Sequence, residues 1–428
     1  MSDTLALPKG TSRRRLIAAA TAGNALEFYD FTLYSFFVLI ISKLYFPVGD
    51  PLVGILLALG TYGVGFLVRP LGGAILGSYA DRAGRKSAVV LTLVLMAMGT
   101  LLIGLAPTYA SVGIAGPLVL VFGRLLQGFS AGGEVGASTT LLVEHAPPES
   151  RGFFGSWQVA SQGLGVALAA FAALVVFATL PQDAAESWGW RIPFLLGTLI
   201  LPVGIALRAT LEESLPQITE PRKTKAAPLR IVFNDHWRRL IIGILVVTGG
   251  TATTTVVLFY MSTYAVRTLQ MPPVVALGAA LCAGLISLLA APLFGRLSDR
   301  LGRRPLMMLG ILLTMASIYP AFVLLNMRPT PVTLLGVVLL LSIFNALANA
   351  PGITALTEYF PTLVRATGLG LVYAGGVTIF GGFGQFFVVW LAGVTGNPLS
   401  PAFYVIAACV LSLIGIYCMP ERSRVPLD

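Results

Sequence analysis

Long apolar stretches alternate with short polar segments along almost the whole chain. An α-helix needs about 20 consecutive apolar residues to cross the hydrocarbon core of a bilayer, and each stretch reaches or approaches that length. The pattern predicts twelve membrane-spanning helices, at 17–43, 52–79, 88–106, 114–142, 153–180, 191–209, 239–266, 273–296, 305–326, 331–355, 367–394 and 400–418. The expected fold class is therefore an all-α membrane protein.

A polar motif occurs twice, once among the first six predicted helices and once among the last six. Residues 77–86 read GSYADRAGRK, and residues 295–304 read GRLSDRLGRR. Such repetition is typical of transporters built from two look-alike halves. We expect a six-helix half at 1–209, a cytoplasmic linker at 210–238 and a second six-helix half at 239–428.

The composition supports a membrane protein. The chain is 56% hydrophobic and 11% charged, with a mean hydropathy of +0.86. Soluble domains carry about 25% charged residues, and a soluble protein this apolar would expose large hydrophobic patches to water. We therefore expect a lipid bilayer to surround the protein.

The net charge of +10 is unevenly distributed. With the N-terminus placed in the cytoplasm, most of the 28 Lys and Arg residues fall in the tails and loops on that side. This bias follows the positive-inside rule, so both termini are predicted to be cytoplasmic. No basic stripe is left over to bind nucleic acid.

Charged residues lie deep within the predicted helices of the first half. They are Glu27, Asp30, Arg69, Arg124 and Glu134. The second half has only Arg267, at the end of a predicted helix. A charge at the bilayer centre costs about 3 kcal/mol on insertion scales, so such residues indicate a functional site by default. The first half is thus expected to supply the charges of the site, and the second half its polar and aromatic wall.

An arginine within the bundle would suit an anionic substrate. Its planar guanidinium binds a carboxylate through two parallel hydrogen bonds, which lysine cannot do. Arg124 is the first candidate for this role and Arg69 the second. The alternative for Arg69 is a permanent ion pair with Glu27 or Asp30 that only packs the helices together.

Three pairs of neutral polar residues are four positions apart, so the members of each pair share one helix face. These further candidates for substrate contact are Gln158 and Gln162, Tyr260 and Tyr264, and Asn345 and Asn349. The two tyrosines have an alternative place in the aromatic belt at the membrane interface.

A carboxylate buried beside an arginine is suited to carry a proton. Burial favours its neutral form and the arginine favours its charged form, so a substrate that occupies the arginine promotes protonation. Glu134, Glu27 and Asp30 are the candidates, in that order. The alternatives are a fixed salt-bridge network and a sodium site made by the same carboxylates. No enzyme, cofactor, catalytic residue or metal site is predicted, because the chain offers no nucleophile–base pair or metal-ligand cluster.

Charged residues at the predicted cytoplasmic helix ends are candidates for gating. They are Asp81 and Arg85, their counterparts Asp299 and Arg303 in the repeated loop, and two pairs that flank short loops, Glu144 with Arg151 and Glu358 with Arg365. Such pairs would form and break between helices as the two halves rock. The alternative for the repeated loops is that they only anchor the topology.

The repeated loop resembles the one that joins the second and third helices of major facilitator superfamily transporters, and its counterpart in their second half. Other stretches resemble the metabolite:proton symporters of that superfamily. These are GNALEFYDF (23–31), FLVRPLGG (66–73), GRLLQGFSAGGE (123–134) and WGWRIPF (188–194). Within that family the chain is most similar to the citrate and tricarballylate branch.

The resemblance implies a major facilitator fold, with twelve helices in two pseudo-symmetric halves, in a bacterial inner membrane. It implies a monomer that imports an organic acid with protons by alternating access. Citrate or a related tricarboxylate is the favoured substrate, and a dicarboxylate such as 2-oxoglutarate, shikimate, or betaine and proline are alternatives. A proton-coupled efflux antiporter is a further alternative.

Overall fold

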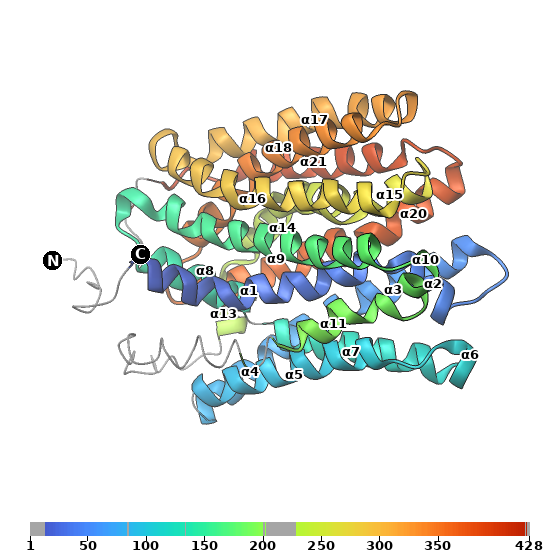
Figure 1. Ribbon diagram of the computed structural model, residues 1–428. Coiled ribbons are helices and arrows are strands. Elements are labelled where there is room, and N and C mark those ends of the chain that lie inside the picture. The colour runs from blue at the N-terminus through green and yellow to red at the C-terminus, as the bar shows by residue number, and fades with distance from the viewer. Residues whose placement is uncertain are drawn as a thin grey trace.

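The computed structural model describes residues 13–83, 85–132, 134–199, 202, 228–423 and 425. In this part of the chain every regular element is helical. The long helices run roughly along one common direction and stack into a bundle (Figure 1). The predicted all-α class is confirmed.

The first part of the bundle begins with a bent helix and ends before residue 200. Its elements are α1 (Arg13–Phe36), α2 (Val38–Tyr45), α3 (Pro51–Leu67), α4 (Arg69–Ala83), α5 (Arg85–Leu105), α6 (Tyr109–Val112), α7 (Ala115–Ala131), α8 (Glu134–Glu144), η1 (Pro148–Ser150), α9 (Arg151–Thr179), α10 (Gln182–Ala184), η2 (Ala185–Gly189) and α11 (Arg191–Gly197).

The second part follows residues 203–227, which lie outside the described residues. Its elements are α13 (Pro228–Asp235), α14 (Trp237–Thr254), η3 (Thr255–Tyr260), α15 (Met261–Arg267), α16 (Pro273–Leu301), α17 (Arg303–Met327), α18 (Pro331–Tyr359), α19 (Arg365–Val377), η4 (Thr378–Gly382), α20 (Gly384–Thr395) and α21 (Ser400–Cys418).

Each of the twelve predicted apolar stretches contains helix. Among the described residues, 8 helical segments are long and apolar enough to cross a membrane, and α1 with α2 forms a ninth that is bent by 60°. Two shorter apolar helices, Val90–Leu105 and Ala115–Ala131, and the short helix α11 account for the others. The sixth predicted stretch continues beyond residue 199, outside the described residues.

Local sequence explains where several helices begin and end. Asp50 precedes α3 and accepts a hydrogen bond from the backbone N–H of Leu52 at 2.8 Å, with Pro51 in the first turn. Thr330 caps α18 in the same way, as expected for residues that satisfy the free N–H groups of a helix start. Gly302 separates α16 from α17 with a φ of 95°, which a residue with a side chain rarely adopts.

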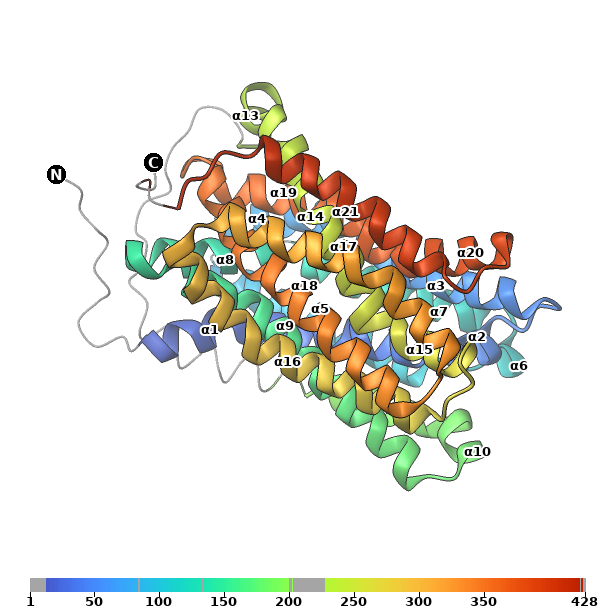
Figure 2. The ribbon, with the colours of Figure 1, turned by 90° about the horizontal axis from the view of Figure 1, so that it is seen from above.

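The two halves meet most extensively where α9 packs against α16. The two helices lie side by side in both ribbon views (Figures 1 and 2). A Cβ on Gly163 would lie 2.7 Å from the carbonyl oxygen of Gly284, so glycine is required for this close approach. The opposite side of α16 exposes a stripe of leucines four residues apart, Leu285, Leu289, Leu293 and Leu297, which is the surface expected to face lipid.

Two helices of the second half are interrupted by π-helical turns. The segment η3 lies between α14 and α15, and η4 lies between α19 and α20. The first contacts α1 and the second contacts α3, so both interruptions face the first half. Because π-helical turns occur frequently at functional sites, this interface is where the candidate site is expected.

Candidate substrate and coupling site

Arg124 is fully buried in the middle of the first half. Its Nη1 donates to Oε1 of Gln127 at 2.9 Å, and its Nη2 donates to the carbonyl oxygen of Tyr62 at 3.2 Å. The guanidinium carbon lies 4.6–5.0 Å from the ring centroids of Phe31, Tyr34 and Tyr62. Its Nε has no hydrogen-bond partner among the described residues. The cation is therefore held mainly by aromatic faces, which leaves it able to bind an anion.

A chain of hydrogen bonds links Arg124 to Asp30 through two neutral residues. Gln127 accepts from Arg124 and donates through Nε2 to the hydroxyl oxygen of Thr100 at 3.0 Å. The Thr100 hydroxyl donates in turn to Oδ2 of Asp30. Asp30 is fully buried, and its Oδ1 accepts no hydrogen bond within the described part of the chain. A buried carboxylate oxygen without a donor is costly unless a proton or a cation reaches it.

The second arginine is already paired. Nη2 of Arg69 lies 2.8 Å from Oε1 of Glu27, and both side chains are almost completely buried. The rings of Phe31 and Phe66 cover the guanidinium of Arg69. The alternative given for Arg69 in the sequence analysis was an ion pair with Glu27 or Asp30. The structure has the ion pair with Glu27.

The second half contributes a cluster of amides and a hydroxyl. Asn349 donates to Oδ1 of Asn345 at 2.7 Å, and Asn345 donates to Oγ1 of Thr254 at 3.0 Å. Thr254 ends α14 immediately before the π-helical turn η3. These three neutral residues satisfy one another's hydrogen bonds, and they bring no charge to the site.

The two other candidate pairs differ in their surroundings. Gln158 is fully buried and accepts a 3.3 Å hydrogen bond from Ser138, whereas Gln162 is half-buried. The hydroxyl of Tyr264 donates to the carbonyl oxygen of Pro398 and accepts from Asn326. These bonds tie Tyr264 to neighbouring helices of the second half. Tyr260 is buried, and its ring centroid lies 6.0 Å from that of Tyr264.

Contacts between the halves were not visible in the sequence motifs. Ser35 of α1 donates to Oε1 of Gln385 in α20 at 2.9 Å. Thr378 of η4 donates to the carbonyl oxygen of Phe66 in α3 at 3.1 Å. Serine and threonine are common in membrane helices, so nothing in these residues alone marks them as contacts. Only the packing of α1 and α3 against the π-helical turns reveals them.

Three of the four candidate gating residues of the second half form one ion-pair cluster. Arg303 bridges Asp299 at 2.8 Å and Glu358 at 3.2 Å. Asp299 also accepts from the backbone N–H groups of Gly152 and Phe153 at 2.7 and 3.0 Å. These N–H groups begin α9 of the first half, where a carboxylate is favourable. The repeated loop therefore ties one half to the other.

The charged residues that flank the two short loops do not pair within their own loop. Glu144 pairs with Arg365 of the second half at 2.5 Å, not with Arg151. Glu358 pairs with Arg303, not with Arg365, and Arg151 donates to the carbonyl oxygen of Val425 at 3.2 Å. The pairing by loop was wrong because loops from different halves come together here. We call this side of the bundle the Arg303 end and the opposite side the Arg267 end.

Three candidates have side chains outside the described part of the structure. They are Glu134, Asp81 and Arg85, of which only the backbone is placed, at the start of α8, within α4 and at the start of α5. Their predicted roles in proton coupling and gating therefore stay predictions.

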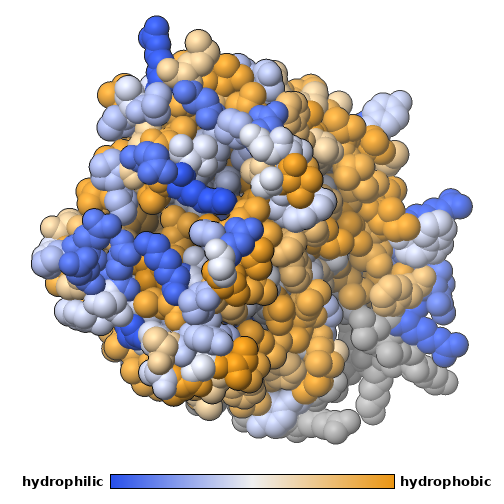
Figure 3. All heavy atoms as spheres, turned by 90° about the vertical axis from the view of Figure 1, so that its right-hand side faces the viewer, coloured by the Kyte–Doolittle hydropathy of each residue, from blue (hydrophilic) through white to orange (hydrophobic). Residues whose placement is uncertain are grey.

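At the Arg267 end the bundle contains a cavity of ≈ 500 Å³. Its walls come from both halves, with Phe36, Lys43 and Glu186 on one side and Ser262 and Arg267 on the other. Figure 3 looks onto this end of the bundle, where hydrophilic residues gather around a hollow. The Arg303 end is bridged by ion pairs while this end is open to a cavity.

Comparisons with known proteins agree with this architecture. Residues 16–227 match the family described as "Sugar (and other) transporter", and residues 279–427 match the family described as "Major Facilitator Superfamily". A citrate-proton symporter of Klebsiella pneumoniae is 36% identical over 422 residues, which is 98% of this chain and 94% of that protein.

Two further comparisons extend the range of relatives. An alpha-ketoglutarate permease of Escherichia coli is 34% identical over 98% of this chain and 96% of that protein. The xylose transporter of E. coli, in a partially occluded inward open conformation, superposes with a TM-score of 0.75 at 18% identity. That match covers 96% of this chain and 98% of that one, and at this identity it indicates the shared fold alone.

Proposed function

The chain belongs to the major facilitator superfamily, among its metabolite:proton symporters, and we propose that it imports citrate or a related tricarboxylate together with protons. Membership explains the twelve-helix fold, and it makes the protein a multi-pass membrane transporter rather than an enzyme. The observation that carries the substrate proposal is Arg124, a fully buried cation with a free Nε in the middle of the first half.

A carboxylate of the substrate would bind Arg124 by replacing its internal partners. Gln127 and the Tyr62 carbonyl now occupy two of its donors at 2.9 and 3.2 Å, and both are neutral acceptors. A carboxylate is a stronger partner, because charge-assisted hydrogen bonds are roughly twice as strong as neutral ones. Asn345 and Asn349 would then donate to the other carboxylates from the second half.

Asp30 would carry the proton. Glu27 and Arg69 balance each other, so the net charge of the cluster depends on Arg124 and Asp30. With Asp30 charged the four groups sum to zero, and with Asp30 protonated they carry one positive charge. A proton on Asp30 therefore prepares the cluster for an anion, and loss of the proton favours release. Glu134 and Glu27 are the other candidates, and sodium at the same carboxylates is the alternative to a proton.

Alternating access would proceed by rocking of the halves about the α9–α16 contact. The cluster around Arg303 and the pair Glu144–Arg365 join the halves at one end, and these contacts would have to break before that end opens. We place the Arg303 end in the cytoplasm of a bacterial inner membrane, because most Lys and Arg residues lie in the loops and tails on that side. We also propose that the transporter acts as a monomer.

Uptake into proteoliposomes tests the function. Purified protein is reconstituted, and entry of labelled citrate is followed with and without an inward proton gradient. Unlabelled tricarballylate, 2-oxoglutarate, shikimate and betaine serve as competitors. We expect gradient-stimulated uptake that tricarballylate inhibits best. Preferential inhibition by 2-oxoglutarate would identify a dicarboxylate transporter. Stimulation by a sodium gradient alone would identify sodium, in place of the proton, as the coupled ion. Citrate leaving the vesicles against a proton gradient would indicate an antiporter.

A further inference from the structure

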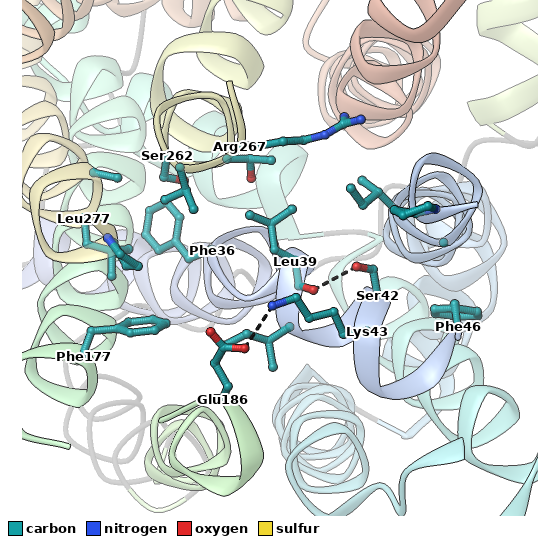
Figure 4. Close-up of a pocket in the computed structure, with 18 of the residues that line it drawn as sticks. Phe36, Leu39, Ser42, Lys43, Phe46, Phe177, Glu186, Ser262, Arg267 and Leu277 are labelled. Carbon is teal, nitrogen blue, oxygen red and sulfur yellow. Dashed lines mark hydrogen bonds and ion pairs between the residues drawn. The ribbon is translucent and has the colours of Figure 1, made fainter. Parts of the chain in front are cut away.

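The cavity at the Arg267 end contains charged groups that the central site does not use. Lys43 and Glu186 meet on one side of the cavity, with Nζ of Lys43 3.0 Å from Oε2 of Glu186 (Figure 4). Arg267 extends from the opposite wall, at the end of α15 (Figure 4). Its guanidinium makes no ion pair or hydrogen bond with the described residues. Since Lys43 and Glu186 cancel, Arg267 gives the cavity a net positive charge.

The backbone around Arg267 is held in an uncommon conformation. Gln270 has a φ of 53°, and among the described residues no other residue except glycine has a positive φ. Its side-chain Nε2 donates to the carbonyl oxygen of Arg267 at 2.6 Å, and the Met271 N–H donates to that of Ala265 at 2.9 Å. Strained residues of this kind cluster at ligand sites, where the surrounding structure maintains them. The turn therefore fixes the place of Arg267 beside the cavity.

We infer that this cavity is a second, separate anion site, in which Arg267 captures a carboxylate of the substrate before it reaches Arg124. The inference rests on the proposed transport of an organic anion. Arg267 would bind one carboxylate through its planar fork, and Lys43 would leave Glu186 to bind a second. The volume of ≈ 500 Å³ lies within the range of small-molecule sites.

The Lys43–Glu186 pair determines how strongly the cavity attracts an anion. A hydrogen bond from Gln182 at 2.9 Å and the pairing with Lys43 hold the pKa of Glu186 below its ordinary value, so this carboxylate is charged at neutral pH. Both side chains are partly exposed, and such pairs exchange partners readily because they are weak. Removing the negative charge should thus strengthen capture, and removing the positive charge should weaken it.

Initial rates of citrate uptake at low and high ionic strength test this inference. Arg267→Gln is expected to raise KM about 10-fold at low ionic strength, the loss of one charged contact, with the maximal rate nearly unchanged. Arg328→Gln is the matched control, since Arg328 follows α17 at the same end but does not line the cavity. The control should keep the KM of the wild type. High salt should reduce the difference between the two proteins, because exposed charges are screened.

Glu186→Gln and Lys43→Gln add a test of opposite sign. The first should lower KM about three-fold because it frees Lys43, and the second should raise KM because it leaves Glu186 facing the anion. Equal KM values for Arg267→Gln and Arg328→Gln, together with no opposite effect of the Glu186 and Lys43 variants, would overturn the inference.

Binding of citrate to detergent-purified protein separates this inference from the proposed function. Titration calorimetry on Arg124→Gln should retain one weak binding site, and the double variant Arg124→Gln/Arg267→Gln should lose it. Failure of the wild type to transport citrate would contradict the proposed function, whereas retained binding that depends on Arg267 would still support the site in the cavity. Binding to Arg124→Gln that does not depend on Arg267 would exclude the site.

Discussion

The two halves bury different chemistry. In the first half, Glu27 and Arg69 form a buried ion pair, and Asp30 is connected to Arg124 through two neutral side chains. In the second half, Asn345 and Asn349 bond to each other and to a threonine, with no charge. The Asp30–Arg124 cluster can change its net charge, whereas the cluster of Asn345, Asn349 and Thr254 cannot. This difference teaches that the first half carries the anion-binding charge together with coupling, and that the second half adds only neutral contacts.

The energetic cost of the two arrangements differs as well. Buried charges must be compensated, and breaking a pair leaves an uncompensated charge that costs about 3–5 kcal/mol. Amides lose only neutral hydrogen bonds, at about 1 kcal/mol each. Substitutions in the first half should therefore have large effects that depend on the proton gradient, and substitutions in the second half should have small effects on affinity.

The largest effect is expected from Arg124→Lys. Lysine keeps the charge and loses the planar fork, so a carboxylate would be bound at one point only. We expect the kcat/KM of citrate uptake to fall about 100-fold or more, since the cation is fully buried. Arg69→Lys is the matched comparison, because Arg69 is already paired with Glu27. A greater loss for Arg69→Lys than for Arg124→Lys would move the anion site to the other arginine.

Asp30→Asn should separate transport from coupling. Asparagine resembles the protonated carboxyl group, so the cluster would keep its positive charge and still bind the anion. We expect gradient-driven accumulation to fall about 100-fold, with citrate–citrate exchange retained within about three-fold, because exchange needs no net proton movement. Both activities are measured in the same proteoliposomes.

Glu27→Gln is the control for that experiment. Glu27 is paired with Arg69 and should not carry the coupled proton, so Glu27→Gln should keep the response to the gradient in whatever protein remains folded. A response lost in Glu27→Gln and kept in Asp30→Asn would reverse the assignment and place the proton on Glu27.

The sequence predicted the fold better than the site. The lengths of the apolar stretches give the helices, because each span must cover the bilayer by itself. The depth of Asp30 and Arg124 in their helices placed both near the centre. Thr100 and Gln127 link them, yet neither is unusual in a membrane helix. Their role depends on how α1, α5 and α7 pack, which no local pattern specifies.

The gating pairs show the same limit more sharply. Glu144 and Arg151 flank one loop and look like partners in the sequence, but Glu144 pairs with Arg365 from the other half. Which charges meet is decided by the approach of two loops that are far apart in the sequence. The repeat predicted that charged residues gather at this end, and only the packed halves determine their partners.

A smaller effect is expected in the second half, from Asn345→Ala. The substitution removes a hydrogen-bond donor and leaves Asn349 and Thr254 without one partner each. We expect the KM for citrate to rise about 10-fold, the cost of one or two neutral hydrogen bonds, with an unchanged response to the proton gradient. Uptake at several gradient sizes measures both. A changed response to the gradient would mean that the second half also takes part in coupling.

The smallest effect is expected where the halves meet, at Glu144. Glu144 is partly exposed and Arg365 is buried, but the Arg365 guanidinium also donates to the backbone carbonyls of Thr357 and Phe360, so loss of Glu144 does not leave it without a partner. Glu144→Gln should therefore change the uptake rate no more than about five-fold, and Glu149→Gln, at an exposed position of η1 nearby, should change nothing. The exchanged pair Glu144→Arg with Arg365→Glu should recover part of the rate lost in Glu144→Arg, since the attraction across the halves is restored while the hydrogen bonds of Arg365 to Thr357 and Phe360 are not. If the exchanged pair recovered nothing relative to Glu144→Arg, the pair would contribute nothing to closing the Arg303 end. The cluster around Arg303 would then hold the two halves together there without it.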